Sequence, residues 1–311
     1  MTNAETLLAH NGSQTVIYQY KNRRTVALYK QAFIRIAGFV FSISSNLNIK
    51  IIKFGESYKN FFCSDKPDVI IQTKYDGLPN IIPIHNSNRV FDSETIWSLY
   101  SINERNALVG SFPYRIALFD RDVKQVEVYS GTKQLPTAPL DDPLQYPFGE
   151  VLMICLLSQG HGLMIHACGI DDSGKGFLFA GNSTHGKTTT AKLWKDHAVI
   201  LNDDRIVIRK KGDHFWMYGT PWHGDYTGVS PQGVPIEKMF FLQHSESNSF
   251  EKITGARAAS MLLARSFPPL WDSEGMTFTL DFCAQLVSTV PCYRLNFKPD
   301  ETIIDFVRCA R

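Results

Sequence analysis

The stretch Gly181-Asn-Ser-Thr-His-Gly-Lys-Thr188 fits the pattern GxxxxGK[ST] at every fixed position. The apolar run FLFA precedes it, and the helix-forming run TTTAKLW begins at its last residue. Glycines let the backbone curl until several N–H groups point inward at a helix N-terminus, which makes a nest for anions. The stretch therefore predicts a phosphate-binding loop between a strand and a helix, an arrangement that holds nucleotides.

The residues of this loop have separate predicted roles. Gly181 and Gly186 hold the curl, while Lys187 reaches the β- and γ-phosphates and the Thr188 hydroxyl ligates Mg²⁺. We therefore expect ATP and Mg²⁺ as ligands. The residues expected to bind them are Gly181, Asn182, Ser183, Thr184, His185, Gly186, Lys187, Thr188 and Thr189.

Two adjacent carboxylates, Asp203 and Asp204, follow the apolar run 198–201, and Asp203 lies 16 residues after Lys187. Neighbouring side chains of a strand point to opposite faces, so the two carboxylates cannot do the same work. One can hold Mg²⁺ while the other accepts a proton from an attacking hydroxyl. The sequence leaves open which does which, and the alternative is a solvent-exposed turn or a helix cap.

The residues around this centre predict a nucleotide-binding α/β (α+β) domain over 149–311. Apolar patterns indicate a short helix at 150–159, strands at 163–170 and 176–180, a helix at 188–194 and a strand at 198–201. The tail predicts a helix, a Pro-broken turn at 268–269, a strand and a final helix.

Residues 1–145 have a different pattern and predict a β-rich N-terminal domain without a catalytic constellation. Short apolar and aromatic runs such as TVIYQY, DVIIQT and YRIALF alternate with polar turns. We expect one helix, at 93–100. Four prolines in 131–148 indicate a boundary between the two domains.

Composition excludes several classes of protein. The 311 residues are 44% hydrophobic, and 32 basic residues nearly balance 30 acidic ones, which argues against nucleic acid or a membrane surface as partner. The N-terminus lacks a signal-peptide pattern, and the longest apolar run, 151–157, is too short to span a bilayer. The six cysteines show no zinc spacing, so we expect reduced thiols in a cytoplasmic protein.

Residues 163–208 resemble the catalytic domain of HPr kinase/phosphorylase and its relatives, which share a nucleotide core with ATP-dependent phosphoenolpyruvate carboxykinase. They carry, in order, His166 in a strand, the GxxxxGK[ST] loop and the acidic pair. The resemblance implies Mg²⁺-dependent phosphoryl transfer from ATP to a hydroxyl. It implies catalytic roles for His166, Lys187, Asp203 and Asp204, metal ligation by Thr188, Asp203 and Asp204, and a homo-oligomer.

The chain also departs from that family. The phosphorolysis signature and the arginine loop that meets HPr are not found after Val207, so we expect another acceptor: a serine of a peptide or protein, or a small serine-like metabolite. Arg205, Arg257 and Arg265 are the cations available for stabilising transition-state charge. The rival hypotheses are a protein that senses ATP without transfer and carboxykinase chemistry on an oxo acid.

The segment MYGTPWHGDYTG, 217–228, is the other feature that resembles HPr-kinase-like proteins. A Gly/Pro-rich loop after a strand can lie at the mouth of an open sheet. Its side chains Tyr218, Trp222, His223 and Asp225 are therefore candidates for a wall of the acceptor or nucleotide pocket. The alternative is a surface turn with a packed tryptophan.

Overall fold

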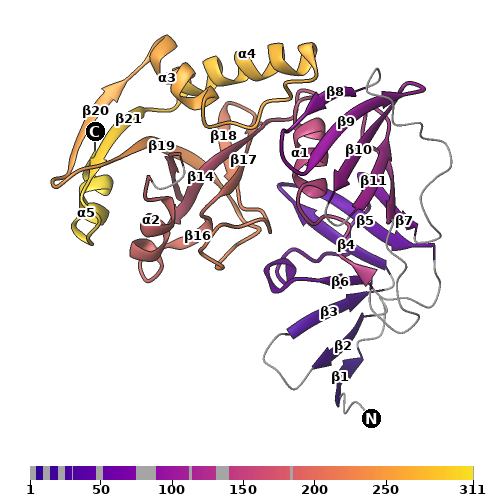
Figure 1. Ribbon diagram of the computed structural model, residues 1–311. Coiled ribbons are helices and arrows are strands. Elements are labelled where there is room, and N and C mark those ends of the chain that lie inside the picture. The colour runs from indigo at the N-terminus through magenta and orange to yellow at the C-terminus, as the bar shows by residue number, and fades with distance from the viewer. Residues whose placement is uncertain are drawn as a thin grey trace. The chain divides into compact units, whose positions relative to one another are not determined.

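The protein is a mixed α+β protein with large β-sheets and few helices (Figure 1). The structure, a computed structural model, describes residues 5–9, 15–19, 25–29, 31–46, 52–74, 89–111, 114–130, 140–182 and 185–310. The chain divides into two compact units, Met1–Cys155 and Leu156–Arg311. Across the described residues, no helix combines the length and apolar character needed to cross a bilayer.

The N-terminal unit contains two β-sheets. The first has five strands, in the order β1 (Glu5–Ala9), β2 (Thr15–Gln19), β3 (Thr25–Tyr29), β6 (Ile52–Phe54) and β13 (Leu140–Asp141). The second has eight strands, in the order β4 (Gln31–Ile36), β5 (Phe39–Ser45), β7 (Val69–Lys74), β12 (Gln125–Ser130), β11 (Tyr114–Phe119), β10 (Arg105–Ser111), β9 (Trp97–Ile102) and β8 (Arg89–Asp92). One 3₁₀ turn, η1 (Glu56–Tyr58), follows β6.

The helix expected at 93–100 is wrong, because these residues form a turn and the start of β9. The Ser93 hydroxyl accepts hydrogen bonds from the main-chain N–H groups of Thr95 and Trp97, which closes the turn. From Trp97 onward the chain pairs with β10, and Leu99 is fully buried. Pairing across the sheet therefore overrides the local pattern.

The C-terminal unit is built on a third sheet. Its order is β15 (Lys175–Ala180), β14 (Leu163–Asp172), β17 (Arg205–Lys211), β18 (His214–Tyr218), β19 (Gly233–His244), β21 (Cys292–Phe297) and β20 (Ser249–Ile253). In addition, β16 (Val199–Asn202) pairs with β14, and β19 pairs with β15. Because the long strand β19 bonds both β18 and β15, the sheet closes on itself around a core.

Five helices accompany the strands in the described parts of the chain. They are α1 (Phe148–Leu157), α2 (Lys187–Trp194), α3 (Gly255–Leu263), α4 (Ser273–Thr289) and α5 (Thr302–Cys309). The helices expected at 150–159 and 188–194 are confirmed by α1 and α2. The strand–turn–strand expected over 163–180 is confirmed by the antiparallel pair β14 and β15.

Strand direction brings distant segments of the C-terminal unit to one edge. β14 is antiparallel to both β15 and β16, while β15 is parallel to β19 and β19 to β21. Consequently β16, β15, β19 and β21 all run the same way. The segments that follow these four strands therefore lie at a common edge of the sheet. Ala167 of β14 lies at the same edge, because it pairs with Ala180 at the end of β15.

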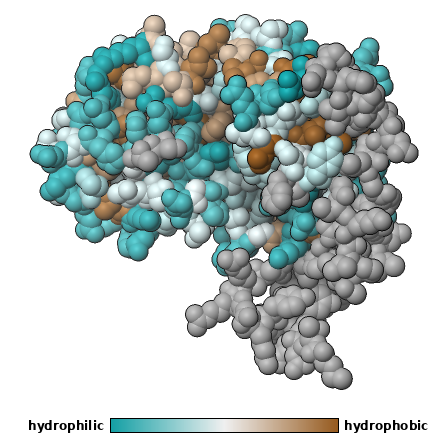
Figure 2. All heavy atoms as spheres, in the orientation of Figure 1, coloured by the Kyte–Doolittle hydropathy of each residue, from teal (hydrophilic) through white to brown (hydrophobic). Residues whose placement is uncertain are grey.

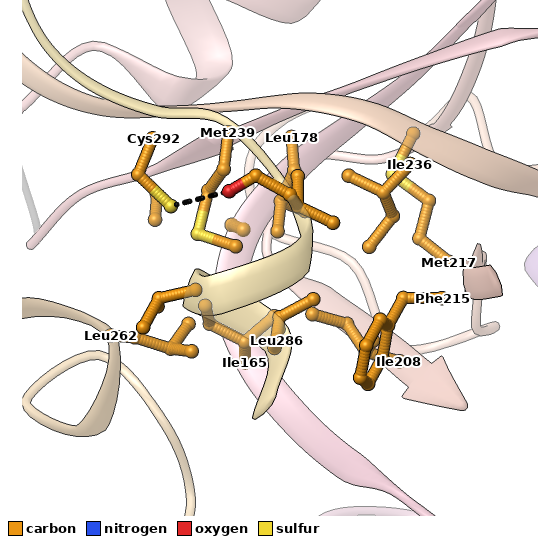
Figure 3. Close-up of a cluster of buried hydrophobic side chains, with 14 of the residues drawn as sticks. Ile165, Leu178, Ile208, Phe215, Met217, Ile236, Met239, Leu262, Leu286 and Cys292 are labelled. Atoms are coloured by element: carbon orange, nitrogen blue, oxygen red, sulfur yellow. Dashed lines mark hydrogen bonds between the residues drawn. The ribbon is translucent and has the colours of Figure 1, made fainter. Parts of the chain in front are cut away.

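The apolar residues of β15 explain how this sheet is covered. Leu178 and Ala180 belong to a buried cluster with Leu262 of α3 and Leu286 of α4 (Figure 3), where the Cys292 thiol donates to the Val290 carbonyl at 3.2 Å. The alternate residues Phe177 and Phe179 belong to a second cluster on α2 and α5. Both faces of β15 are buried, which is why FLFA is apolar at every position.

The surface of the C-terminal unit is largely hydrophilic in the view of Figure 2, with hydrophobic residues gathered over α3 and α4. Leu270, before α4, is 62% exposed, and Leu280, on α4, is 48% exposed. These two leucines are large apolar side chains that remain in contact with solvent near α3 and α4.

Candidate functional site

The GNSTHGKT stretch leaves β15 after Ala180 and enters α2 at Lys187. Gly186 has φ +95°, and a Cβ there would lie 2.4 Å from Phe297 Cζ, so only glycine fits. The Gly186 carbonyl accepts from the Thr190 N–H at 2.8 Å and from the Thr190 hydroxyl at 2.9 Å. The described part of the stretch therefore has a left-handed glycine directly before a helix, while Ser183 and Thr184 lie outside the described residues.

Lys187 points back at the main chain of the same stretch. Its Nζ donates to the Gly181 carbonyl at 3.0 Å and to the Asn182 carbonyl at 2.9 Å. Burial lowers the pKa of this ammonium below its usual range, although the carboxylates of Asp204 and Asp203 favour its charged form. A buried cation that donates to carbonyls can exchange these bonds for those of an anionic ligand.

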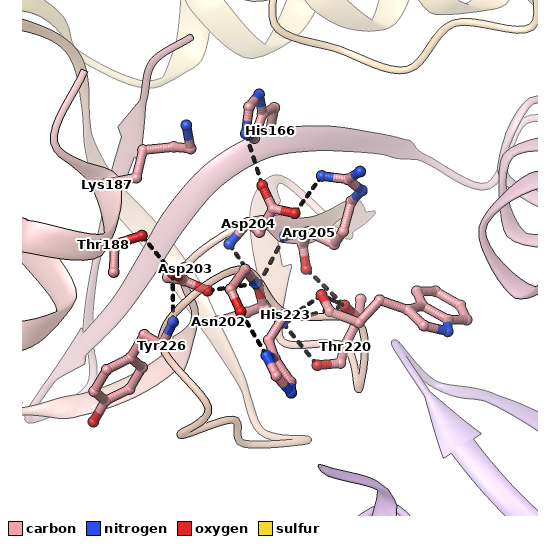
Figure 4. Close-up of polar contacts among 12 residues, drawn as sticks. His166, Lys187, Thr188, Asn202, Asp203, Asp204, Arg205, Thr220, His223 and Tyr226 are labelled. Carbon is pink, nitrogen blue, oxygen red and sulfur yellow. Dashed lines mark hydrogen bonds and ion pairs between the residues drawn. The ribbon is translucent and has the colours of Figure 1, made fainter. Parts of the chain in front are cut away.

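Asp203 is fixed by three donors from two other segments (Figure 4). The Thr188 hydroxyl donates to its Oδ2 at 2.7 Å, and the Tyr226 N–H donates to the same atom at 3.1 Å. The Gly224 N–H donates to its Oδ1 at 2.9 Å. The residue is 1% exposed. Asp203 thus joins the start of α2 to the segment 217–228.

Asp204 has different partners. His166 Nε2 lies 2.7 Å from its Oδ1, and Arg205 Nη1 lies 2.6 Å from its Oδ2. Burial raises the pKa of the Asp204 carboxyl, but the His166 hydrogen bond and the Arg205 charge outweigh it and hold the pKa below its usual range. Its side chain is 21% exposed, so an approaching group can reach it.

Asn202, which the sequence reasoning missed, ties these parts together. Its side-chain amide donates to the carbonyls of Thr220 and Trp222, each at 2.9 Å. Its Oδ1 accepts from the N–H groups of Asp204 and Arg205. The only signal in the sequence is an amide side chain directly after an apolar run, since a buried Asn needs such bonds.

The segment 217–228 does lie against the acidic pair, but through its main chain rather than the four side chains expected. Tyr218 and Trp222 are buried. His223 turns its Nδ1 to the neighbouring Gly224 carbonyl at 2.8 Å, and Asp225 is exposed.

Two of the three candidate arginines lie at this edge. Arg205 bonds Asp204, and its guanidinium lies 4.4 Å from the centre of the Phe267 ring. The Arg265 carbonyl accepts from the His166 N–H at 2.8 Å. Its Nε is buried with no hydrogen-bond partner in the part of the chain that is described, and burial lowers the pKa of its guanidinium. Arg257 is exposed and pairs instead with Glu251 of β20.

The oxygen donors suit Mg²⁺ better than a metal that needs a protein cage. Among the residues described, no three or more His, Cys, Asp or Glu side chains gather in a way that could hold a metal ion. The Thr188 hydroxyl and Asp203 carboxylate supply adjacent hard oxygens at 2.7 Å. Mg²⁺ is commonly held by one or two such oxygens with phosphates and waters completing its shell.

Comparison with known proteins gives two findings. A family model described as “ScmC: SynChlorMet cassette protein ScmC” matches residues 149–300, just under half of the chain. Among solved structures, the chain is similar to the Hpr(Ser) kinase/phosphatase from Coxiella burnetii, with 10% identity, a TM-score of 0.29, and coverage of 47% of this chain and 93% of that chain. No curated protein matches the chain.

The HPr kinase family expected from the motifs is therefore matched only by a weak structural likeness, and the family model that matches is a different one. Over the part of the chain that carries the candidate site, the protein is similar to the ScmC family.

Proposed function

We propose that the protein is a Mg-ATP-dependent kinase that transfers the γ-phosphoryl group to a hydroxyl acceptor, through an HPr-kinase-like phosphate-binding core at 163–208. The observation that carries this proposal is the 2.7 Å contact between the Thr188 hydroxyl and Asp203 Oδ2, which brings the glycine-rich loop and the acidic pair together. A loop alone would suit any anion. A loop that contacts one carboxylate, Asp203, and lies near another that can accept a proton, Asp204, suits phosphoryl transfer.

The residues on the Thr188 side would hold the triphosphate. Lys187 would release the carbonyls of Gly181 and Asn182 and bind phosphate oxygens, with the α2 N-terminus beside it. Thr188 and Asp203 would hold Mg²⁺. When bound, Mg²⁺ supplies positive charge against the β- and γ-phosphate oxygens. Arg265 donates through Nη1 to the Met261 carbonyl, and its Nε has no hydrogen-bond partner among the described residues, so it is a further cation that could meet this charge.

The residues on the His166 side would handle the proton. Asp203 is committed to three donors, whereas Asp204 is partly exposed and paired with His166. The acceptor oxygen would form a bond to the γ-phosphorus as the bond to the β–γ bridging oxygen breaks. The hydroxyl proton would pass to the His166–Asp204 pair, and ADP would leave with the bridging oxygen.

Transfer from γ-labelled ATP with Mg²⁺ into Ser-containing peptides and small hydroxyl metabolites tests the proposal. We expect labelled product from the wild type and about 10²- to 10⁴-fold less from Asp204→Asn, because a positioned general base contributes roughly that factor. ATP affinity should change far less than transfer, because Lys187 and the loop are the proposed phosphate contacts, although the variant removes a carboxylate that favours the charged form of Lys187. Asp213→Asn, in the exposed turn between β17 and β18, is the matched control and should transfer normally.

Equal transfer by wild type and Asp204→Asn would overturn the proposed role of this carboxylate. A wild type that binds ATP but labels no acceptor would favour the rival hypothesis, a protein that senses ATP without transfer. That hypothesis uses the loop and Lys187 in the same way but gives the His166–Asp204 pair no proton to accept. A peptide, a protein and a small hydroxyl compound all remain in the acceptor pool, because nothing in the site selects among them.

A further inference from the structure

We infer that the site takes a nucleoside triphosphate in particular, and that the base stacks on the imidazole ring of His244 at the end of β19. This inference rests on the proposed function, because it assumes that a triphosphate occupies the loop before α2. It adds a binding surface for the base. Such a surface would let the protein bind a nucleotide in preference to an inorganic polyphosphate as the phosphoryl donor.

The order of the strands sets the direction in which the ligand lies. β15, which leads into the loop, has β14 and then β16 on one side, and β19 and then β21 on the other. The acidic pair follows β16, so the transferred γ-phosphate must lie toward that side. The base is at the opposite end of the molecule from the γ-phosphate. It is therefore directed toward the ends of β19 and β21.

His244 and Phe297 stand at those two ends and face each other across the parallel pair. Their ring centroids are 5.4 Å apart and the rings are inclined by 29°, a stacked arrangement. Phe297 is buried and His244 is exposed. A hydrogen bond from the Ser245 N–H to the Phe297 carbonyl, 3.1 Å, fixes the strand ends. The phenyl ring thus supports an imidazole ring that solvent reaches.

The same two rings adjoin the phosphate-binding stretch. A Cβ at Gly186 would meet Phe297 Cζ at 2.4 Å and His244 Cε1 at 3.2 Å. Gly186 directly precedes Lys187, the residue proposed to bind the phosphates. The exposed His244 ring therefore lies beside the proposed phosphate site, on the side away from the γ-phosphate. The base of a bound nucleotide would lie on that side. Stacking on an aromatic side chain tolerates any base, because every base has a π-face.

Binding of ATP and of inorganic tripolyphosphate, both with Mg²⁺, to wild type and His244→Ala separates the base from the phosphates. We expect the wild type to prefer ATP, and His244→Ala to lose about 5- to 150-fold in ATP affinity, the range that removal of one stacking side chain produces. Tripolyphosphate affinity should change less than twofold. His244→Phe keeps an aromatic surface and should retain ATP affinity. His214→Ala, an exposed histidine on β18, is the matched control.

Each other outcome has one meaning. An equal loss of both ligands in His244→Ala would show that the ring supports the loop rather than a base, and unchanged ATP affinity would show that the base lies elsewhere. Either result overturns this inference and leaves the proposed function intact. A wild type that binds neither ATP nor tripolyphosphate would overturn the proposed function itself.

Discussion

The two neighbouring aspartates differ because their surroundings differ. Asp203 faces main-chain N–H groups of the segment 217–228 and the Thr188 hydroxyl, and it is almost fully buried. Asp204 faces two cationic or protonatable side chains, His166 and Arg205. Main-chain donors hold a carboxylate in a fixed position, whereas a His partner can share a proton. This contrast is the basis for assigning metal ligation to one and proton transfer to the other.

Asp142, in the N-terminal unit, should make stability depend on pH. Burial raises the pKa of its carboxyl to about 6, against the opposing hydrogen bonds from Leu144 and Tyr58 and the Arg115 charge. The unfolded value is about 3.9. Between these values the folded chain binds more protons than the unfolded chain, so the free energy of unfolding falls as pH rises through that window. Asp142→Asn should remove this loss, which amounts to at most about 3 kcal/mol.

Urea unfolding of the full chain from pH 4 to pH 7, followed by a probe in the N-terminal unit, measures the effect. The stability of the wild type relative to Asp142→Asn should fall as pH rises across the window, and the two should agree best near pH 4. A difference between the two that stays constant or favours the wild type increasingly between pH 4 and pH 6 would contradict the assignment.

At the level of residues, the sequence predicted which side chains meet but not how they are held. Lys187 and Thr188 begin α2, Asp203 and Asp204 follow β16, and His166 lies inside β14, where it pairs with Arg205 at the start of β17. Their supports could not be predicted. Asn202 acts through main-chain groups some 20 residues away, and such contacts leave no local pattern.

The segment 217–228 contacts Asp203 through main-chain N–H groups, and Gly224 is the position that tests whether this contact positions the carboxylate. Its N–H bonds Asp203, and a Cβ there would lie 3.1 and 3.2 Å from the Asp203 carboxylate oxygens. Thr188 and Tyr226 prevent the carboxylate from moving freely aside. Gly224→Ala should therefore shift Asp203 by a few tenths of an ångström and lower transfer, by less than the roughly 100-fold that a 1 Å misplacement can cost. Stability should fall by only about 1 kcal/mol.

Steady-state rates with Mg-ATP and urea unfolding of the same sample check this prediction. Gly55→Ala is the control, because that glycine has ordinary φ and its nearest neighbour is 3.9 Å away. If Gly224→Ala transferred phosphate at the wild-type rate, the segment would not be what positions Asp203.

Elements with continuous apolar runs were predicted well, and α4, a long helix that was missed, was missed for a physical reason. The runs at β15 and β16 are buried on the sheet apart from their first residues, so their composition is unambiguous. The helix α4 was not predicted because Thr, Phe and Val occur throughout SEGMTFTLDFCAQLVST. Its buried positions Gly275, Thr279, Phe282, Cys283 and Leu286 follow a helical period, which is visible once the partner cluster is known.

At the scale of the whole molecule, each unit has its own buried apolar cluster. Tyr100, Ala107, Ile116 and Leu118 form one in the N-terminal unit, and larger clusters lie on both faces of β15 in the C-terminal unit. Every residue of the candidate site belongs to the C-terminal unit. The role of the N-terminal unit cannot be predicted from its sequence, because strand patterns specify packing and carry no chemistry.

This division predicts where Mg-ATP will stabilise the protein. A ligand that binds only the folded state adds RT ln(1 + [L]/Kd), about 2.7 kcal/mol at a hundredfold excess over Kd. For a unit of this size each kcal/mol raises Tm by about 2–4 °C, so saturating Mg-ATP should raise the Tm of the C-terminal unit by about 5–10 °C.

Calorimetry of the full chain, with amide hydrogen exchange to assign each transition, measures this shift. Protection should increase in α2 and β16 and stay unchanged in β10 and β11, because ligand energy reaches only segments that unfold with the site. Lys187→Ala should abolish the shift, since the ammonium is the main proposed phosphate contact. An equal rise in both units would instead mean that they unfold together, in which case the N-terminal unit would also respond to the nucleotide.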